Sequence, residues 1–256
     1  RENEESIKVE QKNLLEQMHI LLVEDNEHNQ FLAQTYLKRN GAKVTTAVNG
    51  TVALEILKET KFDAILMDIQ MPEMDGNETT IHIRKELGLH VPIVACSAHA
   101  LESEKQRCLS NGMNDYITKP YNESEMVRTL ARYGKRNSRS ISPKSGDKPR
   151  LVTSDEVMIT LSDIEKKEGK GFARTLISMF NQSAEGLIDD ISRNLREKSW
   201  DELQKKAHYT AGVLSNFPFM EGVNRSRHLE KMLKERNVSE TEKAATELID
   251  YLGNCK

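Results

Sequence analysis

Two patterns of apolar and polar positions divide the chain near residue 150. Up to about residue 133, short runs of aliphatic residues alternate with longer segments in which apolar residues recur every three or four positions. The short runs predict β-strands at 20–24, 43–47, 62–67, 92–96 and 116–117. The longer segments predict helices at 29–38, 50–59, 78–87, 100–110 and 123–133. This alternation predicts an α/β, doubly wound, five-stranded parallel sheet with helices on both faces.

Beyond residue 152 the sequence has helical periodicity and no strand-like run. One apolar stripe at three-four spacing contains Leu176, Phe180, Ala184, Leu187, Ile191 and Leu195. Ser199 with Glu202, and Ser239 with Glu242, have the spacing of capping boxes, which mark the beginnings of two further helices. Long helices joined by short turns predict an all-α helical bundle over residues 153–256.

The segment between the two patterns, residues 134–152, is basic and has no hydrophobic period. We interpret it as a flexible basic linker rather than as a phosphate-binding patch. Residues 1–18 are charged and only faintly periodic, so we expect them to be residual linker. The α/β domain then covers residues 19–133, and 256 residues are a comfortable length for two domains of average size.

Composition narrows the classes of function. The 37 basic and 40 acidic side chains give a formal net charge of −3, so the overall charge does not suggest nucleic-acid binding. The longest apolar runs have strand length, which argues against a membrane-spanning helix and against direct membrane contact. The three cysteines form no CxxC pair and favour buried thiols in a reducing compartment. We expect a cytoplasmic fragment of a longer chain, whose other parts could include a membrane anchor.

Polar residues gather where the predicted strands end. Glu24 and Asp25 follow the first strand, Asp68 the third, Ser97 the fourth and Lys119 the fifth. Since ligands bind beyond the carboxyl ends of the strands of an open parallel sheet, we expect these side chains to meet. Three converging carboxylates repel unless a cation lies between them, and oxygen ligands favour Mg²⁺. With a lysine and a hydroxyl beside them, they form a site for phosphoryl transfer in which Asp68 is the nucleophile.

The segments ILLVEDN, ILMDIQMPEMDG, PIVACSAHA and YITKP, in this order, resemble the receiver domain of two-component response regulators. The resemblance covers about residues 19–133 and implies a flavodoxin-like fold. It implies that Asp68 is the phosphoacceptor, that Asp25 coordinates Mg²⁺ or Mn²⁺ directly, and that Glu24 does so through water. The backbone carbonyl of Gln70 would be a further metal ligand.

The same resemblance assigns the switch residues. Ser97 stands at the position of the switch hydroxyl, where threonine is commoner, and Tyr116 at that of the switch aromatic residue. Lys119 matches the family's active-site lysine, and its peptide bond to Pro120 is expected to be cis.

His208 is the second candidate for chemistry. Helical geometry places Leu203, Ala207, Thr210 and Leu214 on one stripe, which we expect to face the core. His208 lies on the opposite side, beside Lys205 and Gly212, so we interpret it as solvent-facing rather than as a satisfied core histidine.

A histidine on the outside of a bundle, with a small residue one turn later, resembles a histidine phosphotransfer (HPt) domain, here over about residues 153–254. The resemblance implies that His208 is a phosphoacceptor. The family usually has a lysine where this chain has Ala211, and we expect Lys205 to supply that charge. Gly212 leaves room for the backbone of a docking partner. Lys205 and Gly212 are therefore the predicted docking residues.

The function expected from both resemblances is phosphorelay signal transduction, in the C-terminal part of a hybrid sensor histidine kinase. An upstream histidine kinase core would phosphorylate Asp68, His208 would accept the group next, and a downstream response regulator would take it from there. The sequence has no glycine-rich nucleotide loop, so we do not expect autophosphorylation from ATP. Two alternatives stay open: a receiver that acts as a phosphate sink beside a protein-binding adaptor, and a response regulator with a DNA-binding helical output.

Overall fold

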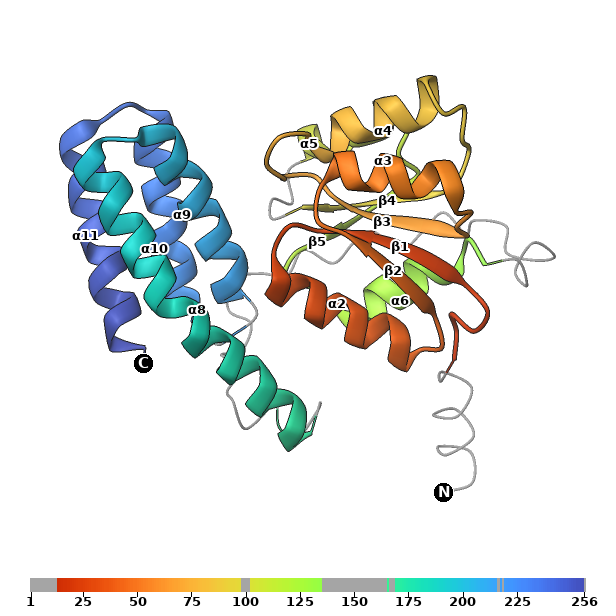
Figure 1. Ribbon diagram of the computed structural model, residues 1–256, viewed down its shortest axis with the longest axis horizontal. Helices are drawn as coiled ribbons and strands as arrows, with labels where there is room; N and C mark the ends of the chain where they lie inside the picture. The colour runs from red at the N-terminus through yellow and green to blue at the C-terminus, as the bar shows by residue number, and fades with distance from the viewer. Residues whose placement is uncertain are drawn as a thin grey trace. The chain divides into compact units, whose positions relative to one another are not determined.

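The computed structural model describes residues 13–97, 102–134, 165, 169–215, 217 and 219–255 (Figure 1). The chain divides into two compact units, and the division falls between residues 151 and 152. Nearly all of the expected linker, residues 135–152, lies outside the described residues. The two units are described separately.

The first unit is built on a five-stranded parallel sheet with the strand order β2-β1-β3-β4-β5. Its strands are β1 (His19–Val23), β2 (Lys43–Ala47), β3 (Ala64–Asp68), β4 (Ile93–Ser97) and β5 (Asp115–Thr118). All residues of β3 and β4 are buried, as are the last four of β1. This burial explains why these three central strands read as continuous apolar runs. The predicted doubly wound α/β fold is confirmed.

Among the described residues of this unit, five helices cover the two faces of the sheet. In Figure 1, α2 (Glu27–Arg39) and α6 (Glu123–Ala131) lie on one face, and α3 (Gly50–Glu59), α4 (Gly76–Lys85) and α5 (Glu102–Ser110) lie on the other. Four of them begin after a side chain that accepts a hydrogen bond from a backbone amide of the first turn. These capping residues are Asn26, Asn49, Asp75 and Asn122.

The packed part of the first unit begins before the predicted boundary at residue 19. Leu15 and Met18 are buried, and the amide of Leu15 donates to the carbonyl of Asn40 at 3.0 Å. The prediction that residues 1–18 are linker is therefore wrong for 13–18. Two apolar side chains in a charged segment are enough to dock it, since each removes its apolar surface from water.

The described part of the second unit contains the helices α8 (Lys170–Glu197), α9 (Trp200–Ser215), α10 (Met220–Lys234) and α11 (Val238–Asn254). Each of these helices packs on two others, and contacts between α8 and α11 close the ring. Short connections join consecutive helices, as in an antiparallel bundle (Figure 1). Among the helices in the described ranges, none has the length and apolar character needed to cross a membrane.

The predicted apolar stripe of α8 faces the bundle core. Leu176, Phe180, Ala184, Leu187 and Ile191 are buried, and Leu195 is half-buried near the end of the helix. The ring of Phe180 lies 5.1 Å from that of Phe217 and 5.2 Å from that of Phe219, measured between centroids. These rings fill the end of the bundle where α9 connects to α10.

The two predicted capping boxes have different outcomes. The helix α9 begins at Trp200, directly after Ser199, as expected. The helix α11 begins at Val238 and is capped by Asn237, whose side chain accepts from the amide of Glu240. Ser239 is therefore already inside the first turn. Asparagine is as good a cap as serine. Capping by Asn237 begins the helix two residues earlier than capping by Ser239 would, and so makes the helix longer.

Candidate phosphoacceptor sites

The acidic residues meet beside the point where the strand order reverses, between β1 and β3. Glu24 follows β1 directly, Asp25 comes next, and Asp68 is the last residue of β3. Each of these three carboxylates offers an oxygen atom, and the three atoms lie within 4.8 Å of one another. The predicted convergence is present, because parallel strands end at the same edge of the sheet.

Lys119 lies between two of the acids. Its Nζ is 2.6 Å from Oδ2 of Asp68 and 2.7 Å from Oε2 of Glu24, and its side chain is 9% exposed. The Lys119–Pro120 peptide bond is cis, as expected. A lysine held in this way can contact any group that is attached to the Asp68 carboxylate.

Two residues that the sequence did not single out hold Glu24. Asn29 Nδ2 donates to Oε1 at 2.8 Å, and the hydroxyl of Tyr121 donates to Oε2 at 2.6 Å. With Lys119, these donors engage both oxygens of a fully buried carboxylate. In the sequence, these two partners of Glu24 are marked only by their positions. Asn29 lies in the first turn of the helix after the acid pair, and Tyr121 directly follows Pro120. Neither signal identifies Glu24 as the partner.

The charges of this cluster depend on one another. Burial and the nearby Glu24 carboxylate raise the pKa of Asp68 to about 7, against the lowering effect of Lys119. Burial alone would lower the pKa of Lys119, but the Asp68 and Glu24 carboxylates hold it above its ordinary value. Without a further cation, burial and the neighbouring carboxylate thus disfavour the ionised form of Asp68.

The site fits a divalent cation. Three carboxylates face a single ammonium group, so full ionisation leaves an excess of two negative charges. The three atoms that could bind a cation are carboxylate oxygens, the type of ligand that Mg²⁺ prefers. The side-chain Oε1 of Gln70, two residues after Asp68, is buried and has no hydrogen-bond partner among the described residues. Charge, ligand type and an unsatisfied oxygen are therefore consistent with a bound hydrated cation.

The loop after β3 folds closely over Asp68. The amide of Gln70 donates to Oδ1 of Asp68 at 3.2 Å, and the amide of Gly76 donates to the carbonyl of Ile69 at 3.0 Å. A Cβ atom on Gly76 would lie only 2.1 Å from the carbonyl oxygen of Asp68. Only glycine allows this approach.

Ser97 ends β4 and is fully buried. Its hydroxyl donates to Oε2 of Glu104 in α5 at 2.6 Å. Tyr116 lies on the neighbouring strand β5 and is half-buried. The expected pair of switch residues is therefore accompanied by an acidic residue that the sequence analysis missed.

His208 lies in α9, in the other unit. The four residues predicted to face the core, Leu203, Ala207, Thr210 and Leu214, are fully buried. The His208 side chain is 30% exposed, because Glu230 of α10 packs beside it and brings Oε1 within 3.5 Å of Nδ1. The expectation of a solvent-facing histidine thus needs correction to a partly exposed one. Glu230 itself is buried and was missed, since it lies on a different helix.

The predicted docking residues lie on the same side of α9 as His208. Lys205 is exposed and forms an ion pair with Glu202 at 2.6 Å. Gly212 is half-buried, and Ala211 is buried. Solvent screens an exposed pair of this kind, so Lys205 can exchange its partner easily.

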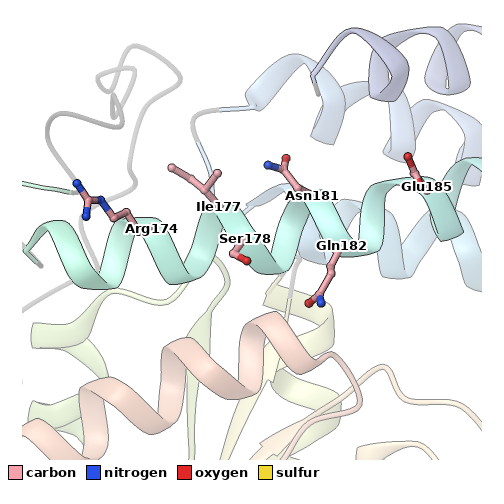
Figure 2. Close-up of a pocket in the computed structure, with 6 residues that line it drawn as sticks. All are labelled: Arg174, Ile177, Ser178, Asn181, Gln182 and Glu185. Atoms are coloured by element: carbon pink, nitrogen blue, oxygen red, sulfur yellow. The ribbon is translucent and has the colours of Figure 1, made fainter.

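A surface hollow follows α8 (Figure 2). It is lined by Arg174, Ile177, Ser178, Asn181, Gln182 and Glu185, all of which project from this one helix. Its two ionisable residues, Arg174 and Glu185, are roughly 16 Å apart along the helix axis. The hollow therefore does not bring reactive groups together as the acidic cluster does.

Comparison with known families agrees with both units. Residues 20–131 match the response regulator receiver domain, and residues 175–255 match the Hpt domain. The second match agrees with the phosphotransfer interpretation of the bundle and not with a DNA-binding output.

Curated relatives and solved structures match one or both parts of the chain. The chain is 32% identical over 200 residues to the sensor histidine kinase GacS of Pseudomonas protegens, covering 76% of this chain and 22% of the relative. It is 48% identical over 114 residues to the autoinducer 2 sensor kinase/phosphatase LuxQ of Vibrio vulnificus, covering 44% of this chain and 13% of the relative.

A crystal structure of the receiver domain of the sensor histidine kinase PA1611 from Pseudomonas aeruginosa, with a magnesium ion in its active-site cleft, is 42% identical. It covers 45% of this chain and 96% of the other, with a TM-score of 0.43. The chain thus spans under a quarter of the length of the curated relatives named here. The chain thus carries a response regulator receiver domain at residues 20–131, followed by an Hpt domain at residues 175–255.

Proposed function

We propose that the chain carries two successive acceptors of a phosphorelay. An upstream histidine kinase core phosphorylates Asp68, the phosphoryl group passes to His208, and a downstream response regulator receives it from there. The observation that carries this proposal is the Asp68 carboxylate, which lies beside a buried lysine and two further acids at the carboxyl end of the parallel strands.

The first transfer requires ionised Asp68. A carboxylate oxygen attacks the phosphorus of the kinase phosphohistidine whose other ring nitrogen carries a proton, the P–N bond breaks with its electron pair going to nitrogen, and the histidine leaves as a neutral ring. Lys119 is placed to balance charge on the phosphoryl oxygens, and the Ser97 hydroxyl can donate a hydrogen bond to one of them. The product is an acyl phosphate on Asp68.

Asp25, Asp68 and the backbone carbonyl of Gln70 would hold Mg²⁺ or Mn²⁺, with Glu24 acting through water. This outer role of Glu24 is supported by its hydrogen bonds, which engage both of its oxygens. When bound, the cation supplies charge neutralisation for the transferred group and favours the ionised form of Asp68.

The second transfer uses a ring nitrogen of His208. If Nδ1 carries the proton and faces Glu230, the lone pair is on Nε2, which then attacks the acyl phosphorus. The P–O bond to Asp68 breaks and regenerates the carboxylate. Glu230 acts here as a positioning residue that fixes the tautomer and orientation of the ring. Lys205 and Gly212 are the proposed docking residues, and Lys205 supplies the charge that Ala211 lacks.

The direct test follows labelled phosphate from a kinase core through the chain. Wild type should carry label on both acceptors, Asp68→Asn should carry none, and His208→Gln should retain label on Asp68 alone. Asp25→Ala should not be labelled from acetyl phosphate. Full labelling of Asp25→Ala in EDTA would contradict the metal site.

The same experiment distinguishes the remaining alternative. Label that reaches Asp68 and never any histidine would show a phosphate sink joined to a non-catalytic adaptor. We further propose that the parent chain is a hybrid histidine kinase and that this part of it is cytoplasmic.

A further inference from the structure

Glu104 accepts a hydrogen bond from the Ser97 hydroxyl, which phosphoryl transfer would use. Ser97 Oγ donates to Oε2 of Glu104 at 2.6 Å, and both side chains are largely buried, that of Glu104 being 14% exposed. The other carboxylate oxygen, Oε1, lies 4.0 Å from Nη2 of Arg107, one turn later in α5. Glu104 is thus held between the hydroxyl and a cation of its own helix.

A hydroxyl has one proton and can donate it to one acceptor at a time. Asp68 pairs with Cys96 in the register of β3 and β4, so Ser97 is the next residue along the strand. A phosphoryl group on Asp68 presents new anionic acceptors to that same hydroxyl. The hydrogen bond to Glu104 is charge-assisted and short, so breaking it costs free energy. Glu104 therefore competes with the phosphoryl oxygens for the Ser97 proton.

We propose that Glu104 is a positioning residue that holds the Ser97 hydroxyl in a bond which must break when Asp68 is phosphorylated. The proposal rests on the phosphoacceptor role of Asp68 proposed above. Arg107 keeps a counter-charge near Glu104 after Ser97 leaves, so the released carboxylate remains paired. Removing Glu104 therefore favours the phosphorylated arrangement.

Tyr116 belongs to the same cluster. Burial raises the pKa of the Tyr116 phenol, a hydrogen bond with Ser97 opposes that shift, and the Glu104 carboxylate adds to it. The carboxylate, the hydroxyl and the aromatic ring therefore affect one another in the unphosphorylated protein. A change in the Ser97–Glu104 bond should accordingly be visible in the NMR signals of the Tyr116 ring.

The test measures the affinity of the full chain for beryllofluoride, a phosphoryl analogue that binds the acceptor carboxylate, in the presence of Mg²⁺. Glu104→Ala should bind it about tenfold more tightly than wild type, because a bond to a charged acceptor no longer has to break. Glu104→Gln, which retains the shape and a neutral acceptor, should show a smaller change in the same direction. Glu102→Gln is the matched control, since Glu102 lies in the same helix, is exposed, and accepts from Gln106. Its affinity should equal that of wild type.

A double-mutant cycle separates positioning from a purely structural role. In a Ser97→Ala background, Glu104→Ala should leave the affinity unchanged, because there is no hydroxyl to release. Unchanged affinity of both Glu104 variants in the wild-type background, or an equal gain with and without Ser97, would overturn the proposal. Failure of the wild-type chain itself to bind beryllofluoride would instead contradict the phosphoacceptor role of Asp68.

Discussion

Asp68 shows how neighbours set the properties of a single residue. Its pKa of about 7 in the fold, raised by burial and by Glu24, compares with about 3.9 for an unperturbed aspartate. Between these two values the folded protein keeps a proton that the unfolded chain has lost. The contribution of Asp68 to the stability of the metal-free protein is therefore greatest below pH 4 and falls as the pH rises towards 7.

Asp68→Asn removes the titrating carboxyl group, and with it the loss of stability that the Asp68 carboxyl causes as the pH rises. In EDTA, the variant should exceed wild type in free energy of unfolding, and the excess should grow by on the order of 2 kcal/mol between pH 5 and pH 8. Urea unfolding at the two pH values measures this difference. Glu59→Gln, which changes an exposed carboxylate of the same domain, serves as control. An excess that does not change with pH would contradict the raised pKa.

Tyr121→Phe isolates one buried hydrogen bond. The variant loses the hydroxyl that donates to Glu24 and leaves a buried carboxylate with fewer donors, so it should cost about 1–3 kcal/mol of stability. Tyr133→Phe is the matched control, because its hydroxyl donates to the carbonyl of Asn114 near the surface at 3.2 Å. Thermal unfolding should show the smaller loss for Tyr133→Phe, and equal losses would count against the role of Tyr121.

Residues at strand ends could be predicted from sequence, whereas their partners could not. Asp68, Ser97 and Lys119 follow from where strands end, which is a local property of the apolar runs. Tyr121 is 97 residues from its partner Glu24, and Glu230 is on a different helix from His208. Such pairs depend on how complete elements pack, and no periodicity of a single element encodes them.

At the scale of elements, the start of a helix was predictable where a large apolar residue lies in its first turn. The helix over Gly50–Glu59 has the predicted bounds, and Asn49 caps it. The helix α4 begins at Gly76, two residues earlier than predicted, because Asp75 provides its cap. Helical periodicity alone did not show this start, since the first turn of α4 has no large apolar residue.

The turn into α4 carries the next prediction. Gly76→Ala places a Cβ atom against the backbone of Asp68, so the loop must move, and we expect a loss of about 1–3 kcal/mol. Gly186→Ala, inside α8 with open space around its Cβ position, should instead be neutral or stabilising by up to about 1 kcal/mol. Urea unfolding followed by circular dichroism compares the two. A Gly76 variant as stable as wild type would show that the loop can relax.

At the scale of the whole molecule, alternation of strands and helices was enough to predict the sheet and the separate bundle. The docking of residues 13–18 was not predictable, because Leu15 and Met18 form no pattern of their own and depend on a surface that exists only after folding.

Transfer between the two acceptors is a prediction about the complete chain. A flexible linker of about 19 residues, as the sequence predicts for 134–152, spans about 24 Å on average. We therefore expect transfer from Asp68 to His208 within one molecule, at a rate independent of protein concentration. Rapid-quench measurement checks this rate. Mixed His208→Gln and Asp68→Asn chains can transfer only between molecules and give the concentration-dependent reference. A wild-type rate that rises in proportion to concentration would exclude transfer within the chain.

The two proposed acceptors differ in exposure, since Asp68 is 3% exposed at the end of a buried strand and His208 has 30% of its side chain exposed on a helix. Two buried carboxylates cannot both reach one phosphorus atom, whereas a partly exposed ring on a helix can approach a buried carboxylate. In the proposed relay, every step must therefore alternate between aspartate and histidine. A cell that contains many receiver domains then needs no further mechanism to prevent phosphoryl exchange between them. The separation of its signalling pathways depends on which histidine each receiver domain recognises.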